Sequence, residues 1–165
     1  MHLFMHNTAY LLLGGNMGNR KAFLSKALDE IRKEAGTIFS KSALYNSAAW
    51  PKDANQHDFL NQVVAIHTSL SAFDLLNAIH NIETKLGRIR KQKWEARIID
   101  IDILFFNADI INTPTLTVPH PHLHKRRFVL VPLHEIASEL KHPVLKRSIQ
   151  DLLTCCPDTL PVKPA

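Results

Sequence analysis

The sequence predicts an α+β fold with a ferredoxin-like βαββαβ core, a mostly antiparallel sheet with two helices packed on one face. Strand-length apolar runs and helical periodicities follow one another in the order β-α-β-β-α-β, and a C-terminal extension comes after them. At 165 residues, with 45% hydrophobic and 21% charged content, the chain is long enough for one well-buried domain. We therefore expect a single domain over residues 1–165, with its core at about 8–140.

The first predicted strand, Thr8–Gly14, is a short apolar run that leads into the glycine-rich turn GGNMGN. Asn19 is suited to cap a helix over Arg20–Ala35, and Gly36 stands where a helix usually ends. Two more strands are expected after this helix, with a polar loop between them: Thr37–Ala48, Trp50–Asp58 (the loop) and Phe59–Thr68.

The second helix is expected to begin at Ser71, because Asp74 three residues later completes a capping-box pattern. Apolar residues then recur at helical spacing until Gly87, a plausible stop. The last core strand, Ile98–Phe106, follows a basic loop, and Asp109–Asn112 is expected to extend the sheet briefly.

The remaining chain has weaker signals. The run 113–125 contains three prolines and three histidines and is expected to be a loop. A helix over Arg126–Leu140 is expected to break at Pro132, and a shorter helix to span Ser148–Cys156. The proline-rich end, 157–165, is expected to be frayed.

The net charge and the cysteine content indicate which binding partners and which cellular compartment to expect. The net charge of +5 and the pI near 9.4 favour anionic partners. The only cysteines, Cys155 and Cys156, are adjacent, so a bridge between them would close almost no loop, and two free thiols in a reducing cytoplasm are expected. No apolar run reaches the length of a membrane span, and no signal peptide is recognisable.

The most informative segment is Gly87–Phe106, in which five basic residues and Trp94 lead into a strand carrying Asp100 and Asp102. Side chains alternate along a strand, so both carboxylates are expected on one face. Paired carboxylates suit Mg²⁺, and basic side chains suit phosphate, although no Walker loop occurs in the sequence. A solvated basic loop and an outward-facing aspartate pair are the alternative interpretation.

Two further clusters could bind ligands. His120, His122 and His124 suggest a transition-metal site, but the flanking prolines and basic residues fit a phosphate-contacting surface or a solvated loop equally well. Phe59 and Asn61 lie two residues apart on one strand face, which suits a flat, hydrogen-bonding heterocycle. Phe59 taken alone is more readily explained as a core residue.

Together these motifs resemble the 6-hydroxymethyl-7,8-dihydropterin pyrophosphokinase family of folate biosynthesis, over about Tyr10–Leu140. The resemblance rests on an ordered set of segments. They are LGGN near the N-terminus, F-L-N at Phe59–Asn61, E-x-x-x-G-R-x-R…W…R-x-x-D-x-D-I at Glu83–Ile103, L-T-V-P-H at Leu116–His120, and R-x-F followed by P-L-x-E-I-A at Arg126–Ala137.

The resemblance implies an ATP-dependent enzyme that transfers pyrophosphate to the pterin hydroxymethyl group, with two Mg²⁺ ions held by Asp100 and Asp102. Arg88 and Arg97 would act with them in catalysis. The implied ATP-binding residues are Glu83, Arg88, Trp94, Arg97, Ile103, His120 and Arg126. The implied pterin-binding residues are Ser47, Phe59, Asn61, Phe128 and Asp100. A monomer that binds neither nucleic acid nor membrane is expected.

Three positions depart from the family pattern. The chain has Ser47-Ala48-Ala49 where a T-P-P-like segment is frequent, His80 in place of a frequent glutamine, and Pro121 in place of an aromatic residue. A different function also fits the fold class, because ferredoxin-like sheets with surface aromatic residues bind single-stranded RNA. A non-catalytic RNA-binding module is therefore the alternative.

Overall fold

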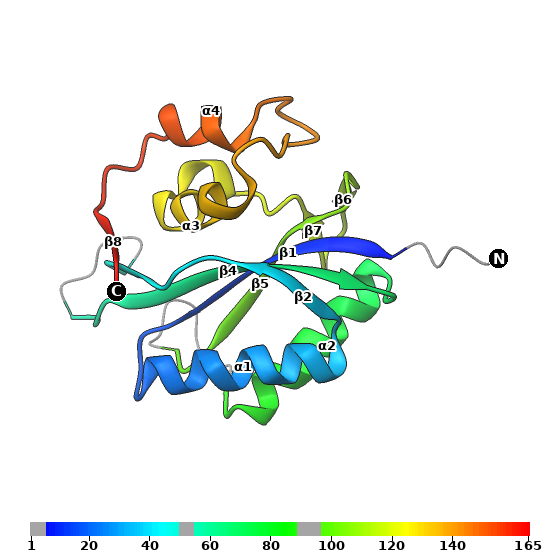
Figure 1. Ribbon diagram of the computed structural model, residues 1–165, viewed down its shortest axis with the longest axis vertical. Helices are drawn as coiled ribbons and strands as arrows, with labels where there is room; N and C mark the ends of the chain where they lie inside the picture. Colours follow the sequence, from blue (N-terminus) through cyan, green and yellow to red (C-terminus); the bar gives the residue numbers. More distant parts are fainter. Residues whose placement is uncertain (1–5, 50–54, 89–96) are drawn as a thin grey trace.

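The computed structural model describes residues 6–49, 55–88 and 97–165 and has the predicted α+β architecture, a sheet between two layers of helices (Figure 1). Its elements in chain order are β1 (Asn7–Gly15), α1 (Arg20–Glu34), β2 (Thr37–Lys41), β3 (Tyr45–Ser47), β4 (Phe59–Thr68), α2 (Ala72–Lys85), β5 (Asp100–Phe106), β6 (Ile111–Asn112), β7 (Thr117–Val118), the 3-10 helix η1 (Leu123–Lys125), α3 (Arg127–Ala137), α4 (Ile149–Thr154) and β8 (Val162–Pro164).

The main sheet has six strands in the order β5-β1-β4-β3-β8, with β2 also paired to β4. Every pairing in it is antiparallel. The path from β5 through β1 and β4 to β2 and β3 fits the ferredoxin-like strand order. Because β5 has a partner on one side only, one of its edges is open to the segments that follow it in the chain.

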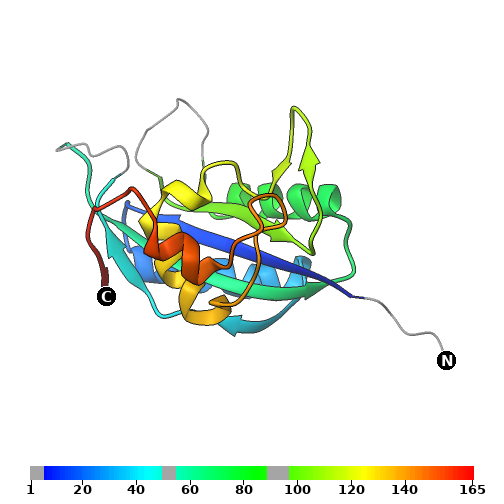
Figure 2. The same ribbon diagram turned by 90° about the horizontal axis from the view of Figure 1, so that it is seen from above.

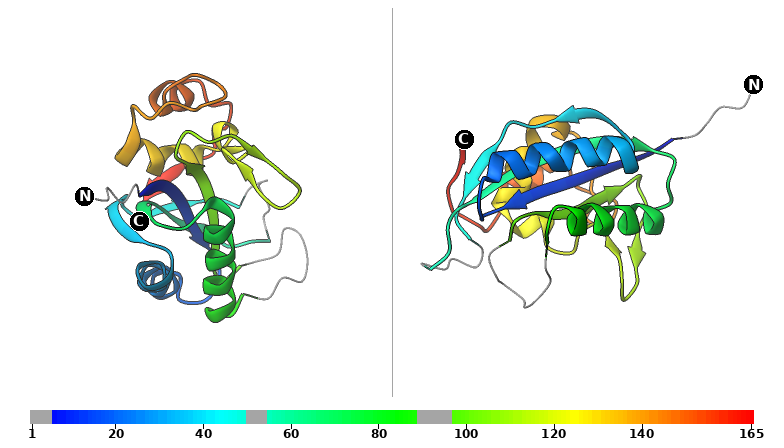
Figure 3. Two further views of the ribbon diagram at one scale, coloured as in Figure 1. Left: turned by 90° about the vertical axis from the view of Figure 1, so that its right-hand side faces the viewer. Right: turned by 90° about the horizontal axis from the view of Figure 1, so that it is seen from below.

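Helices cover both faces of this sheet: the two core helices share one face, as predicted, and the C-terminal helices, which the sequence assigned to no face, cover the other. α1 and α2 pack on one face, and α3 and α4 pack on the other (Figures 1 and 3). Each face has its own core: Leu11, Leu13 and Ile101 pack toward α1 and α2, whereas Leu12 and Leu104 pack toward α3. The C-terminal extension thus supplies the second layer.

Local sequence signals set the helix ends as expected. The Asn19 side chain accepts a hydrogen bond from the Ala22 N–H at 3.1 Å, and Ser71 accepts one from the Asp74 N–H at 3.2 Å. Gly87 follows α2 with a φ of +93°, which favours glycine. Gly36 is required for a different reason, because a Cβ there would lie 2.2 Å from the His67 carbonyl oxygen.

Two of the strand predictions were wrong in detail. The predicted strand Thr37–Ala48 is two strands, because Ser42 interrupts it: the Ser42 hydroxyl accepts from the Val63 N–H at 3.0 Å and takes the place of a backbone partner. The predicted sheet extension at Asp109–Asn112 pairs instead with β7, and this β6–β7 hairpin stands apart from the main sheet beside α2 (Figure 2).

Two C-terminal predictions were also wrong. α3 runs unbroken through Pro132, because the missing N–H removes only the bond to the Phe128 carbonyl in the first turn. The end expected to fray forms β8, which pairs with β3, and the Ala165 N–H donates to the Leu44 carbonyl at 2.9 Å. Both cysteines are free, as expected. Among the described residues, no helix is long and apolar enough to span a membrane.

Candidate active site

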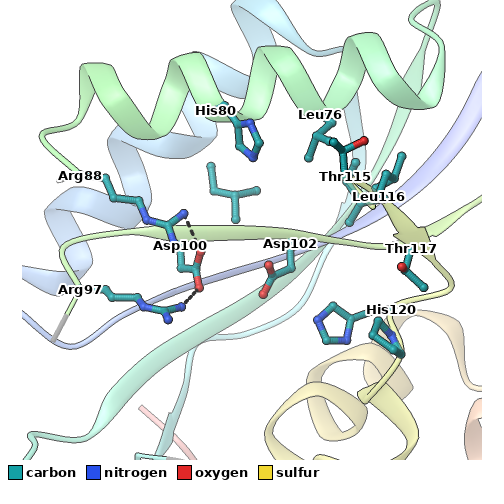
Figure 4. A pocket seen from close by; sticks show the side chains of 13 residues that line it. Leu76, His80, Arg88, Arg97, Asp100, Asp102, Thr115, Leu116, Thr117 and His120 are labelled. Atoms are coloured by element: carbon teal, nitrogen blue, oxygen red, sulfur yellow. Dashed lines mark hydrogen bonds and ion pairs between the residues drawn. The ribbon is translucent and has the colours of Figure 1, made fainter. Parts of the chain in front are cut away.

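A cavity of about 320 Å³ lies along the open edge of β5 (Figure 4). Side chains of α2 and β5 border it, together with the two arginines at the ends of the basic loop and the segment from Thr115 to Pro121. The lining residues are Leu76, His80, Arg88, Arg97, Asp100, Ile101, Asp102, Ile103, Thr115, Leu116, Thr117, His120 and Pro121. Six of the predicted site residues therefore meet here: Arg88, Arg97, Asp100, Asp102 and Ile103 from the motif at Glu83–Ile103, and His120 from the motif at Leu116–His120.

The strand register explains why both aspartates point the same way. Asp100 is paired with Gly14 and Asp102 with Leu12, and cross-strand partners share a face. Leu12 belongs to the core under α3, whereas Ile101 belongs to the core under α1 and α2. The carboxylates therefore lie on the α3 side of the sheet, where that of Asp100 points toward Arg88 and Arg97 (Figure 4).

Two arginines converge on Asp100. Arg88 Nη1 lies 2.9 Å from Asp100 Oδ1, and Arg97 forms an ion pair with Oδ2 of the same carboxylate (Figure 4). Glu83 forms a second ion pair with Arg88 and also accepts a bond from the Ile101 N–H at 3.3 Å. Glu83 is only 2% exposed, so it holds Arg88 and β5 from behind rather than lining the cavity.

Of the two aspartates, Asp102 is the one whose ionised form is destabilised by its surroundings. Burial and, second to it, the charge of Asp100 raise its pKa from 3.8 to about 7, against the opposing effect of Arg97, Arg126 and Arg88. Arg126 does not line the cavity but lies close enough to interact electrostatically with Asp102, and burial lowers its pKa. The site thus holds a carboxylate whose negative charge is only partly compensated by protein groups.

This donor set fits Mg²⁺. Mg²⁺ prefers oxygen ligands and is usually held by one or two carboxylates together with substrate phosphates. Asp100 and Asp102 supply the carboxylates, and the raised pKa of Asp102 shows that a cation would relieve an unfavourable charge there. The open, basic cavity beside them leaves room for phosphate.

His120 is neutral at physiological pH. Burial and, to a smaller extent, the nearby charges of Arg126 and His122 lower its pKa from 6.5 to about 4. Its Nδ1 accepts a hydrogen bond from the His122 N–H at 3.2 Å, which places the ring proton on Nε2. His120 can therefore donate a hydrogen bond to an oxygen in the cavity without adding charge.

The histidines do not form the transition-metal site considered from the sequence. His124 stacks edge-on with His142 at 6.4 Å between ring centroids, away from His120, which is 6.1 Å from the His122 ring. In the described part of the chain, no three His, Cys, Asp or Glu side chains are grouped so as to bind a metal.

The predicted pterin residues lie on the same sheet face, beyond Gly14. Asn61 pairs with Gly14, and its amide donates to the Ser47 hydroxyl at 2.7 Å. Phe59 is paired with Ser47, and Phe128 lies in the first turn of α3, which packs on this face. A Cβ at Gly14 would lie 2.9 Å from Asn61 Oδ1, so the glycine leaves space for the amide.

Asn16 is a structural residue that the site prediction missed. Its Oδ1 accepts from the Arg97 N–H at 2.7 Å, and its own N–H donates to the Arg97 carbonyl at 2.9 Å. Its amide also donates to the His57 carbonyl at 3.2 Å. Asn16 therefore fixes Arg97 at the cavity and joins it to the loop before β4; the LGGN motif was the signal that could have found it.

Gly15, the second glycine of the LGGN motif, also has a structural role. A Cβ there would lie 2.4 Å from the Ile98 carbonyl oxygen, so only glycine lets the chain after the basic loop approach β1. Trp94, together with the other residues from 89 to 96, lies outside the described residues. Leu76 and Thr115, which line the cavity, carried no recognisable functional signal, whereas Thr117 belongs to the L-T-V-P-H motif.

Comparisons with known proteins agree on one family. A family model described as 7,8-dihydro-6-hydroxymethylpterin-pyrophosphokinase (HPPK) matches residues 10–138. A 2-amino-4-hydroxy-6-hydroxymethyldihydropteridine pyrophosphokinase of Bacillus subtilis is 41% identical over 138 residues, which are 83% of this chain and 82% of the relative. A protein of the same description from Aquifex aeolicus is 40% identical over 144 residues, 87% of this chain and 89% of the relative.

Solved structures agree on the fold. The crystal structure described as Plasmodium falciparum HPPK-DHPS wild type with pteroate superposes with a TM-score of 0.76 over 91% of this chain. The sequence identity is 19%, so this likeness concerns the fold alone. The present chain spans 44% of that longer chain.

Proposed function

The chain belongs to the 7,8-dihydro-6-hydroxymethylpterin-pyrophosphokinase family, and on that premise we propose how its residues divide the work of the reaction. The enzyme transfers pyrophosphate from ATP to 6-hydroxymethyl-7,8-dihydropterin and gives AMP and the pterin diphosphate, in folate biosynthesis. The observation that carries the assignment of residues is the convergence of Asp100 and Asp102 with Arg88, Arg97 and His120 on one cavity.

Asp100 and Asp102 would hold two Mg²⁺ ions together with the ATP phosphates. When bound, Mg²⁺ neutralises negative charge on the phosphoryl oxygens and so makes the phosphorus easier to attack. Asp100 is fixed for this role by Arg88 and Arg97, which keep its carboxylate in one orientation. The same register that places Asp102 opposite Leu12 keeps it in the shielded part of the site.

The basic groups would stabilise the charge that develops during transfer. Arg88 and Arg97 are always protonated and can contact phosphate oxygens with two N–H groups each. Glu83 positions Arg88, and His120 donates its Nε2–H to a triphosphate oxygen. Arg126 adds a positive charge on the α3 side of Asp102. Such preplaced donors commonly contribute factors of about 10²–10³ each to the rate.

The pterin would lie between Phe59 and Phe128, with Asn61 as its hydrogen-bonding partner. Because the Asn61 amide nitrogen is engaged by Ser47, its Oδ1 is held in a fixed orientation next to Gly14. Asn61 is paired with Gly14, and Gly14 is paired with Asp100, so a line of cross-strand partners leads from the pterin residues to the carboxylates. A ligand along this line would bring its hydroxymethyl group to Asp100 and Asp102. Ile103 lines the nucleotide side, and Trp94 would contribute from the basic loop.

The RNA-binding alternative is not favoured. An RNA-binding sheet presents its aromatic residues on an open face, but here α3 and α4 pack on the face that α1 and α2 leave uncovered. We also propose that the enzyme acts as a monomer in the cytoplasm, without nucleic-acid or membrane partners. Light scattering at micromolar concentration tests the monomer, and a dimer mass would contradict it.

Formation of AMP from ATP and the hydroxymethylpterin, with Mg²⁺ present, tests the function. Asp100→Ala and Asp102→Ala are each expected to lower the rate by about 10²-fold or more while the protein stays folded. Asp109→Ala is the matched control, since Asp109 is an exposed aspartate just beyond the same strand. Full activity in both site variants would refute the metal assignment, and an inactive native enzyme would refute the function.

A further inference from the structure

Helix α3 has no N-terminal cap of its own, although it carries Phe128 in its first turn. Arg126 stands at the N-cap position, and its side chain makes no capping hydrogen bond. α1, α2 and α4 are each capped by a local side chain, from Asn19, Ser71 and Ser148. The first N–H groups of a helix have no partner within it, so the start of α3 needs an acceptor from elsewhere.

Asp158, thirty-one residues later in the chain, supplies that acceptor. Its Oδ2 accepts from the Arg127 N–H at 2.9 Å, and its Oδ1 accepts from the Leu160 N–H at 2.9 Å. The first bond satisfies the first residue of α3, and the second fixes the turn that holds the carboxylate in place. A carboxylate at this position also interacts favourably with the positive end of the helix dipole.

The chain beyond Asp158 is anchored at its other end to β3, the strand that carries Ser47. Val162 pairs with Ser47 and Pro164 with Tyr45 in the antiparallel pairing of β8 with β3. Figure 1 shows this segment running from α4 past α3 down to the sheet edge. Residues 158–165 therefore connect the first turn of α3, which holds Phe128, with the strand that ends at Ser47.

We propose that Asp158 is a positioning residue for pterin binding, which acts by fixing the first turn of α3 relative to β3. This proposal rests on the proposed function, because it assumes that Phe128 and Phe59 contact the pterin. Without the cap, the first turn of α3 loses a backbone partner and Phe128 loses its fixed position. Arg126 shifts as well, but the proposed ATP site still contains Arg88, Arg97 and the carboxylate pair. The loss of the cap therefore weakens binding of the pterin more than binding of ATP.

The kinetic test compares Asp158→Ala and Asp158→Asn with Ser148→Ala. Ser148→Ala removes the cap of α4, a comparable structural loss at a helix that carries no proposed ligand residue. Asp158→Ala is expected to raise the KM for the pterin by about fivefold, the ratio that a lost cap of about 1 kcal/mol corresponds to. The KM for ATP is expected to stay within about twofold. Asp158→Asn keeps one acceptor oxygen, which can serve the Arg127 N–H while the bond from the Leu160 N–H is lost, and is expected to recover part of the pterin affinity.

A second measurement reads the first turn of α3 directly. Trypsin cleaves after arginine, and Arg126 and Arg127 stand at the start of α3, so Asp158→Ala is expected to be cut there about fivefold faster than the native enzyme. Ser148→Ala is expected to leave the rate of cleavage at this point unchanged. Mass spectrometry of the fragments identifies the position of the cut.

Each outcome decides the proposal. If Asp158→Ala and Ser148→Ala give the same pterin KM and the same cleavage rate after Arg126 and Arg127, Asp158 has no positioning role. The proposal is also overturned if Asp158→Asn is as impaired as Asp158→Ala. The native enzyme is assayed first: if it forms no AMP from ATP and the pterin, the proposed function fails, independently of the cleavage result.

Discussion

Replacing Asp102 by asparagine should stabilise the metal-free protein while removing its activity. The native carboxylate is costly, because burial and the charge of Asp100 raise its pKa from 3.8 to about 7. One pKa unit corresponds to about 1.36 kcal/mol, so this rise corresponds to an upper bound of about 4 kcal/mol at neutral pH and above. Burying the asparagine amide also costs free energy, and we expect a net gain of about 2 kcal/mol.

The stability gained by Asp102→Asn should depend on pH, because only the native carboxyl titrates. Between pH 4 and pH 7 the folded protein holds a proton on Asp102 that the unfolded chain has released, so the native carboxyl lowers stability progressively as the pH rises. The amide of the Asp102→Asn variant does not titrate. The stability difference between the variant and the native protein should therefore be small at pH 4 and reach its full size above pH 7.

Urea unfolding in the presence of EDTA measures this difference at pH 4, 6 and 8. EDTA keeps the protein free of Mg²⁺, and the effects of all other titrating groups cancel between the two proteins. Thermal unfolding at pH 8 should show a rise in Tm of about 5 °C. With Mg²⁺ and an ATP analogue present, the native protein should gain more stability than the variant, because only it keeps both carboxylates.

Asp109→Asn is the matched control, since Asp109 is exposed and its replacement should change stability by less than about 0.5 kcal/mol. A variant that is no more stable than the native protein at pH 8 would refute the reasoning. So would a gain in stability that is equally large at pH 4, because close to the unfolded pKa of 3.8 most of the cost of ionising the buried carboxyl has not yet arisen.

Three other predictions follow from single contacts. Glu83→Gln should destabilise by about 2 kcal/mol in urea unfolding and raise the KM for ATP, since a buried partner of Arg88 is lost while Asp100 remains; unchanged values would show that Asp100 alone holds Arg88. Gly15→Ala should destabilise by about 2 kcal/mol or more, because its Cβ would meet the Ile98 carbonyl at 2.4 Å, and native stability would disprove this close approach. His142→Asn should flatten the loss of stability below about pH 6.5, since burial and His124 lower the pKa of His142 and the unfolded chain binds its proton more readily; a pH profile identical to the native one would contradict this.

Much of the fold could be predicted because its signals are local. Helix α2 follows from the Ser71 cap, the apolar spacing and Gly87, and all three stand within one short segment. The common face of Asp100 and Asp102 follows from strand alternation alone. The family resemblance then joined these local signals with His120 and Arg126, which no periodicity could connect to the carboxylates.

Other features could not be predicted, because their partners are distant in the chain. Ser42 ends β2 by bonding to Val63, and Asn16 holds Arg97 across 81 residues. The tail of the chain looked frayed because prolines dominate it, but β8 is at the edge of the sheet, where a missing N–H is tolerated. A local pattern does not specify which edge is free to receive such a strand.

The sequence by itself determined the order of the core elements, the caps of α1 and α2 and the chemical character of the site, because periodicity, capping and charge are properties of neighbouring residues. Only the tertiary structure decided that α3 and α4 close the second face of the sheet, that Glu83 stands behind Arg88, and that Asp158 caps α3. Each of these depends on packing between segments far apart in the chain. Their positions follow from the free energy of the whole fold, and no single segment encodes them.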